Sequence, residues 1–149
     1  TQSQKLFSGA FRVQYGALCF RQKGTGPDIE ILLITSRDTG RWVIPKGWPM
    51  KRKPPHQAAA TEAMEEAGVR GKANKTLIGR YIYLKELANG DVTPVIVEMY
   101  QVRVTKVHKD FKEKGQRVLA WFDPSEAARR VREVALKSLL VNFRPIDSD

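Results

Sequence analysis

The sequence lacks several features that would place it in a structural or membrane class. It has one cysteine, Cys19, among 149 residues, so no intramolecular disulfide can form. No apolar run reaches the ~18 residues that a membrane-spanning helix needs. The first ten residues contain no apolar stretch like that of a secretory signal. We therefore expect a cytoplasmic protein that is not inserted in a membrane.

Acidic residues are also few, and this scarcity indicates the kind of partner. The chain has 16 acids against 26 lysines and arginines, a formal net charge of +10. Such an excess favours a polyanion, either a nucleic acid or a highly phosphorylated small molecule; the alternative is a basic surface that only solvates the protein. The sequence has neither the interleaved aromatic and basic residues of an RNA-binding sheet nor zinc-finger spacing. Composition therefore points to phosphate groups without indicating which kind of molecule carries them.

Strand and helix patterns alternate along the chain. Apolar and β-branched segments predict strands at residues 11–22, 29–36, 41–47, 76–87, 93–104 and 117–122. Helices are predicted at residues 55–67 and 123–143. Pro55 suits a first helical turn and Gly68 a C-terminal cap, whereas Asp123 and Glu126 have capping-box spacing. No linker or repeat divides the sequence. We predict one domain over residues 1–149, with a core at about 11–143, of the α+β class with a mixed β-sheet between α-helices.

The predicted helix at residues 55–67 carries a close group of acids. Glu62, Glu65 and Glu66 stand at i, i+3 and i+4, and no base on the same stripe compensates them. They also lie near the C-terminal end, where the helix dipole disfavours negative charge. A solvated acidic face would explain this pattern. A divalent cation site would explain it too, because Mg²⁺ prefers carboxylate oxygens and often shares its shell with substrate phosphate.

The loop before this helix adds a more specific pattern. The stretch PKGWPMKRKPPHQAAATEAMEEAGV resembles the Nudix box, which reads Gly, five residues, Glu, seven residues, Arg-Glu-apolar, one residue, Glu-Glu, one residue, Gly-apolar. The positions filled at the correct spacing are Gly47, Glu62, Ala63, Glu65, Glu66, Gly68 and Val69. The segments ALCFRQ, EILLITSRDTGRWVIPKG and RVLAWFDPSEAARRV look like the diphosphoinositol polyphosphate phosphohydrolase branch of the Nudix hydrolase family. The resemblance covers roughly residues 11–143 and implies the Nudix fold.

Two positions depart from the box. Lys53 stands where the box has its first Glu, and Thr61 stands where it has Arg before the first helical Glu. Because the two replaced residues have opposite charges, we hypothesise a single coupled exchange of a structural ion pair. The three helix carboxylates are retained.

The resemblance also implies a catalytic site. It implies a Mg²⁺-dependent pyrophosphohydrolase, for which Mn²⁺ is a possible substitute, acting on an acid anhydride. Glu62, Glu66 and the backbone carbonyl of Lys46 would be metal ligands, and Glu65 would accept a proton from the attacking water. The residues that would contact substrate phosphates are Arg12, Ser36, Arg37 and Arg117; the alternative is that these four are ordinary surface residues.

Three functions remain open at this point. The first is hydrolysis of a phosphoanhydride bond in a molecule such as a diphosphoinositol polyphosphate or a dinucleoside polyphosphate. The second is a catalytically weakened Nudix-fold binding protein, which the changes at Lys53 and Thr61 suggest. The third is an RNA-directed pyrophosphohydrolase or binder, which the positive charge suggests. The intact carboxylates favour the first over the second, and the missing stacking motif weakens the third.

Overall fold

The computed structural model describes residues 11–147, and an eight-stranded mixed sheet forms its centre. The strands are β1 (Arg12–Gln22), β2 (Ile29–Thr35), β3 (Trp42–Val43), β4 (Lys46–Gly47), β5 (Val69–Ala73), β6 (Gly79–Glu86), β7 (Val92–Val107) and β8 (Leu119–Phe122). The main strand order is β3-β2-β1-β7-β5, with β4 on β1, β6 on β7 and β8 on β2. β1 and β7 run parallel, and the other pairs are antiparallel.

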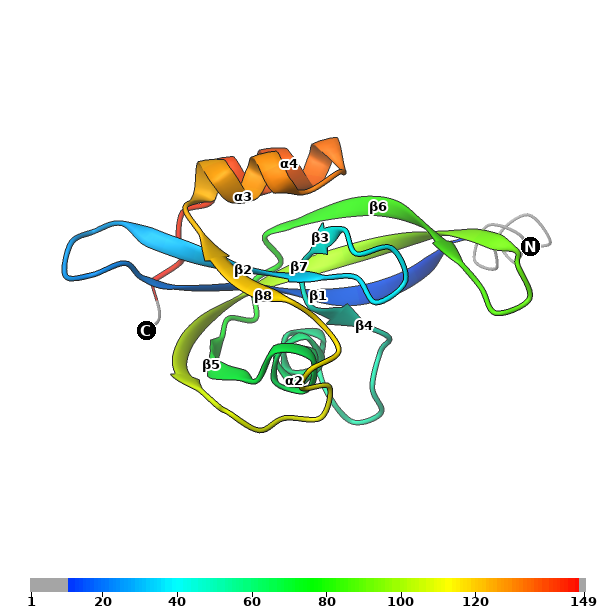
Figure 1. The fold of residues 1–149 in the computed structure, drawn as a ribbon, viewed down its shortest axis with the longest axis horizontal. Coiled ribbons are helices and arrows are strands. Elements are labelled where there is room, and N and C mark those ends of the chain that lie inside the picture. The colour runs from blue at the N-terminus through cyan, green and yellow to red at the C-terminus, as the bar shows by residue number, and fades with distance from the viewer. Residues whose placement is uncertain (1–10, 148–149) are drawn as a thin grey trace.

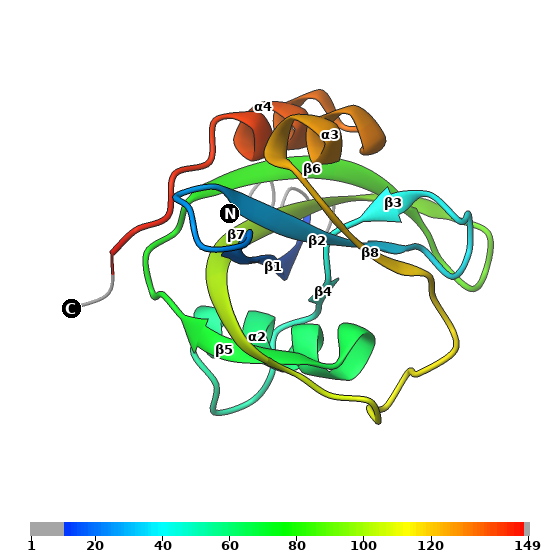
Figure 2. The same ribbon diagram turned by 60° about the vertical axis from the view of Figure 1, so that its left-hand side comes forward.

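Three helices cover the two faces of this sheet. α2 (Pro55–Ala67) lies on one face, and α3 (Pro124–Arg130) and α4 (Val134–Val141) lie on the other (Figures 1 and 2). Each face has its own buried apolar cluster, one under α2 and one under the helix pair. The expected fold class, a mixed sheet sandwiched between helices, is therefore confirmed. No helix within residues 11–147 combines the length and the apolar content that a membrane crossing requires.

Helix α2 has the bounds that its sequence predicts. Pro55 occupies the first turn, where no intrahelical N–H bond is needed. Gly68 ends the helix with a φ of 72° and donates its backbone N–H to the Met64 carbonyl; this left-handed conformation favours glycine. Buried alanines such as Ala59 and Ala63 let the helix lie close to β1 and β7. The glutamates of α2 are thereby held at a fixed height above the sheet.

Three local expectations are wrong, and one strand was not expected. The predicted helix at residues 123–143 is two helices, because Val131 is extended, with φ −86° and ψ 162°. Asp123 makes no side-chain cap hydrogen bond and instead accepts one from Lys23 Nζ at 2.8 Å. The segment 41–47 divides into β3 and β4, which pair with different strands. Residues 69–73 form β5, which the polar composition of this segment did not indicate. The segment is ordered as a strand because it pairs with β7.

Candidate active site

The carboxylates of α2 line a small polar cavity, which we call the acid cavity. It has a volume of about 330 Å³ and contains Glu62, Glu65 and Glu66. A fourth carboxylate, Glu113, enters it from the loop between β7 and β8. The sequence reasoning missed Glu113, because it lies in a charged loop with no motif of its own. Only the fold brings this residue to the helix.

Glu66 is the most enclosed of these carboxylates, with only 7% of the residue exposed. Its Oε1 accepts a hydrogen bond from the backbone N–H of Lys46 at 3.3 Å. Burial raises the pKa of Glu66 to about 7, and the charges of Arg117 and Lys46 oppose this shift. The ionised carboxylate therefore lacks enough positive charge around it to offset its lost hydration.

Glu62 lies directly against the backbone of β4. A Cβ added at Gly47 would be 2.2 Å from Cδ of Glu62, so a side chain there would displace the carboxylate. Glycine is needed at this position because the carboxylate occupies the space. Burial raises the pKa of Glu62 to about 7, and the neighbouring Glu66 and Glu65 charges add to the shift.

In the folded chain, cations from outside α2 approach two of the three acids. Lys112 Nζ lies 3.6 Å from Glu65 Oε1, and Arg117 Nη2 lies 3.7 Å from Glu66 Oε2. Both cations come from the segment after β7 and not from α2. The acids of α2 therefore have no cation on their own helix, but Glu65 and Glu66 each have one nearby in the folded chain.

Arg117 is held by protein groups on several sides. Its Nε and Nη2 donate to Glu113 Oε1 at 3.2 and 3.1 Å, and its Nη1 donates to the Thr35 carbonyl at 3.0 Å. Its side chain is only 9% exposed. The structure thus places Arg117 at the floor of the acid cavity, bridging Glu113 and Glu66. Its predicted contact with substrate phosphate stays a prediction.

The loop that carries Glu113 is fastened to the C-terminal end of α2. The His108 N–H donates to the Gly68 carbonyl at 2.7 Å, and the Glu113 N–H donates to the Glu65 carbonyl at 3.0 Å. The Phe111 ring covers Gly68, where an added Cβ would lie 2.3 Å from the ring. These contacts satisfy carbonyl groups at the helix end and fix the fourth carboxylate beside the other three.

A larger basic cavity of about 1010 Å³ adjoins the acid cavity. The two share six lining residues, namely Ser36, Asp38, Lys46, Trp48, Tyr83 and Lys85. Five cationic side chains line this basic cavity, namely Arg12, Arg41, Lys46, Lys85 and Arg132. Of the residues predicted to bind phosphate, Ser36 belongs to both cavities, Arg37 and Arg117 line the acid cavity, and Arg12 lines the basic cavity. The fold therefore gathers all four into two connected cavities, although they come from distant parts of the chain.

The donor groups of the acid cavity suit a hard divalent cation. Within residues 11–147, no three His, Cys, Asp or Glu side chains are placed so that they could hold a metal ion by themselves. Glu62 and Glu66 nevertheless share one polar cavity, where burial raises the pKa of both carboxyl groups to about 7. Since Mg²⁺ usually completes its shell with water and substrate phosphate, two carboxylates are a fitting protein contribution.

The two residues that depart from the box contact each other. Lys53 Nζ donates to Thr61 Oγ1 at 2.7 Å, and Thr61 Oγ1 donates to the Gln57 carbonyl at 2.9 Å. The hydrogen bond joins the loop before α2 to the helix and lies outside the lining of the acid cavity. This contact supports the hypothesis of a coupled exchange, which stays a hypothesis.

Introducing both charges of the Nudix box should have a larger effect than the sum of the two single changes. Lys53→Glu alone leaves an acid beside α2 without a base, and Thr61→Arg alone places a second cation near Lys53. The double variant can form an ion pair, so we expect a coupling of about 0.5 kcal/mol or more in the free energy of unfolding. Urea denaturation of the four proteins measures it, and additive effects would remove the hypothesis.

Comparison with known proteins assigns the chain to a family. The family model of the NUDIX domain matches residues 10–141, so the chain belongs to the NUDIX domain family. Diphosphoinositol polyphosphate phosphohydrolase 3-beta of Bos taurus is 29% identical over 122 residues, which are 80% of this chain and 68% of that protein. Diphosphoinositol polyphosphate phosphohydrolase 2 of Rattus norvegicus is 30% identical over 122 residues, which are 80% of this chain and 62% of the relative. The chain therefore spans about two thirds of the length of these relatives.

Solved structures support the fold. A C. elegans Ap4A hydrolase superimposes with a TM-score of 0.61 at 20% identity, covering 88% of this chain and 94% of that one. The NUDIX domain of Shewanella oneidensis NrtR, complexed with ADP ribose, gives 0.62 at 12% identity, with 93% and 94% covered. The expected family and the Nudix-type pyrophosphohydrolase class are confirmed by the domain match and the named relatives. Nudix hydrolases generally use divalent metal ions. The single domain over residues 1–149 stays a prediction.

Proposed function

We propose that the chain is a Mg²⁺-dependent hydrolase that cleaves a phosphoanhydride bond in a highly phosphorylated small molecule. A diphosphoinositol polyphosphate or a dinucleoside polyphosphate is a suitable substrate. The observation that carries this proposal is the direct junction of the acid cavity and the basic cavity. Carboxylates suit a divalent cation, and the adjoining cations suit the several phosphates of one substrate.

In this proposal, some residues of the acid cavity bind the metal and another accepts a proton. Glu62 and Glu66 would hold the metal, and the Lys46 carbonyl would be a further ligand. A bound Mg²⁺ would neutralise diphosphate oxygens and orient the attacking water. As the water oxygen bonds to phosphorus, the bond from phosphorus to the bridging oxygen breaks and the electron pair leaves with the departing phosphate. Glu65 would accept the water proton, and its side chain is more exposed than that of Glu66, 32% against 9%.

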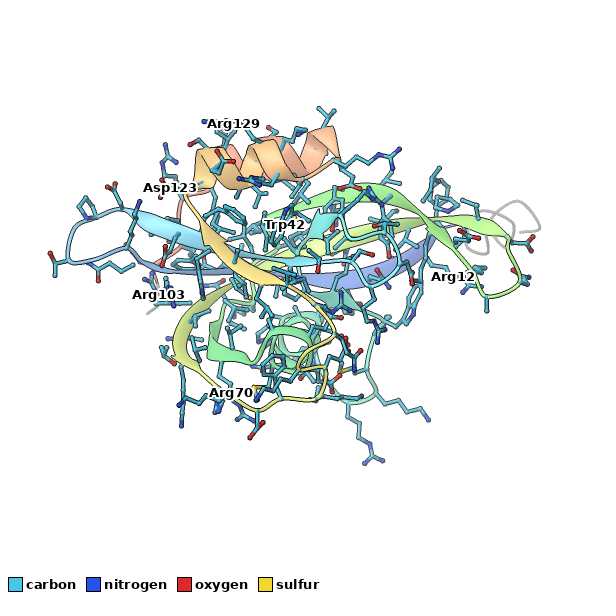
Figure 3. The ribbon with its side chains drawn as sticks, viewed as in Figure 1. Arg12, Trp42, Arg70, Arg103, Asp123 and Arg129 are labelled. Atoms are coloured by element: carbon cyan, nitrogen blue, oxygen red, sulfur yellow. The ribbon has the colours of Figure 1, made fainter. Side chains whose placement is uncertain are left out.

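The cations would bind the substrate away from the reacting phosphorus. Arg12 lies at the start of β1 (Figure 3). Its guanidinium lies 6.0 Å from the centre of the Trp48 ring. Arg37 donates to Gln116 and has a side chain that is 54% exposed, so it can reach a ligand in the acid cavity. Burial lowers the pKa of Lys46 to about 8, which leaves its ammonium mostly charged at neutral pH.

Substrate charge gives the test of this assignment. Arg12→Ala and Arg37→Ala should each raise KM about tenfold for a diphosphoinositol polyphosphate with little change in kcat, because remote charged contacts act mainly as uniform binding. Arg129→Ala is the matched control, since this exposed arginine lies on α3 (Figure 3) and lines neither cavity. The measurement is kcat and KM for a diphosphoinositol polyphosphate, a diadenosine polyphosphate and a nucleoside triphosphate at two salt concentrations.

Each result of this panel has a definite meaning. A preferred triphosphate together with arginine variants that match the wild type would overturn the polyphosphate assignment and leave the metal chemistry standing. Tight binding without turnover would favour the binding-protein alternative. Release of pyrophosphate from a 5′-triphosphorylated RNA, faster than from any small molecule, would favour the RNA-directed alternative.

A further inference from the structure

The outer face of the β6–β7 hairpin carries an exposed apolar patch. Its most exposed side chains are Ile82 at 53%, Leu84 at 68% and Val92 at 59%, with Phe11 at 40% beside them. In Figure 1 this hairpin extends beyond the helices. Single exposed apolar residues are ordinary, but a contiguous group marks an interaction surface.

The strand register makes the group contiguous. Ile82 lies opposite Ile96, which in turn lies opposite Val13. Leu84 lies opposite Pro94, one row closer to the hairpin turn. We call the set the hairpin patch: Phe11, Val13, Ile82, Leu84, Val92, Pro94 and Ile96. None of its members belongs to either buried cluster, so within residues 11–147 neither core uses it.

The patch borders a free sheet edge. In the described part of the chain, β6 pairs with β7 and with no other strand. An eight-residue edge strand with apolar side chains presents unpaired N–H and C=O groups to any complementary strand. The strand also contains no proline, which would block such pairing.

The exposed side chains of β6 are complementary to themselves. They are Arg80, Ile82, Leu84 and Glu86, in that order along one face. In an antiparallel pair centred on Tyr83, Arg80 stands opposite Glu86 of the partner subunit, and Ile82 stands opposite Leu84 of the partner subunit. A two-fold axis makes each contact twice. This strip has one base and one acid, so two copies can meet here although the chain as a whole carries a net charge of +10.

We propose that two copies of the chain associate through β6, antiparallel about Tyr83, so that the two sheets become continuous and the exposed apolar side chains of the two β6 strands lie side by side. The observations favour a second copy as the occupant, because an antiparallel copy of β6 places an acid opposite each base and an apolar side chain opposite each apolar side chain. The proposal does not rest on the proposed hydrolase activity. The β6 residues Tyr83, Leu84, Lys85 and Glu86, together with Val92, also line the basic cavity, so the interface would form part of its wall.

Charge exchange on β6 tests the proposal on the full chain. Analytical ultracentrifugation of the wild type should give a dimer. Glu86→Arg places like charges opposite each other twice and should raise the dimer dissociation constant about tenfold. Arg80→Glu should do the same, and the double variant should restore the wild-type dimer. Glu86→Arg leaves the Arg80–Glu98 ion pair of 3.0 Å in place, so its effect cannot come from that contact.

Three outcomes would overturn the proposal. The first is a wild-type chain that stays monomeric up to its solubility limit. The second is a dimer whose dissociation constant neither single variant changes, which would place the interface elsewhere. The third is a double variant that dissociates as much as the single ones. Circular dichroism on every variant establishes that each is folded, and these solvent-exposed side chains give no reason for unfolding.

Discussion

Replacing Glu66 by Gln should lower kcat about a hundredfold or more in the presence of Mg²⁺ and should weaken the binding of Mg²⁺. The change keeps the shape of the side chain but removes one of the two carboxylates that the acid cavity offers to a cation. Calorimetric titration of Mg²⁺ or Mn²⁺ measures the affinity, and Glu126→Gln on α3 is the control, since this glutamate lies outside both cavities.

The fold should survive this change. Because burial raises the pKa of Glu66 from its ordinary value of 4.5 to about 7, the metal-free folded state loses stability as the pH rises between these values, and the full cost is present at pH 8. Gln removes this cost, so the melting temperature at pH 8 should be unchanged or higher. Unaltered Mg²⁺ affinity in the variant would mean that the three helix acids form a solvated face and not a metal site.

Glu65 should respond differently from Glu66. If Glu65 accepts the water proton, Glu65→Gln should lower kcat by about 10²- to 10⁴-fold and leave Mg²⁺ affinity nearly unchanged. The Glu66 variant thus reports on metal binding, and the Glu65 variant reports on proton transfer. Equal losses of metal affinity in both would mean that Glu65 is a ligand as well.

Replacing Arg117 by Met should lower the free energy of unfolding by about 3 kcal/mol. Its guanidinium donates to Glu113 and the Thr35 carbonyl and lies 3.7 Å from Glu66, and its side chain is 9% exposed. Met fills a similar volume but leaves two enclosed carboxylates without their shared cation. Arg117→Lys keeps the charge but not the fork of donors, so an intermediate loss is expected.

Arg37 provides the matched control for Arg117. It approaches the same Glu113 carboxylate at 3.7 Å, but its side chain is 54% exposed. Arg37→Met should therefore cost less than about 1 kcal/mol. Urea denaturation at pH 8 without metal compares the two. An Arg117→Met protein as stable as the wild type, but with a raised KM, would assign this guanidinium to substrate phosphate.

Sequence reasoning succeeded where the signal is local. Helix α2 was predicted with its true bounds, because Pro55 and Gly68 act within their own turns. The box positions were found because they lie close together in the sequence. The apolar segments of the sheet were also found, although β7 extends to Val107, three residues beyond the segment expected.

The rest depends on contacts between distant residues. Glu113 becomes part of the acid cavity only through hydrogen bonds from its loop to the end of α2. Arg117 compensates Glu66 from 51 positions away in the sequence, so no helical pattern could show it. Residues 69–73 are ordered by pairing with β7, and the break at Val131 lets α3 and α4 pack separately on the sheet.

The most direct test of the account is phosphate release from a diphosphoinositol polyphosphate by the wild type and the Glu65→Gln variant, each with and without Mg²⁺. We predict release by the wild type only when Mg²⁺ is present, and about a hundredfold less release by the variant. Release by the wild type that is independent of a divalent cation, or equal release by the two proteins, would contradict the account.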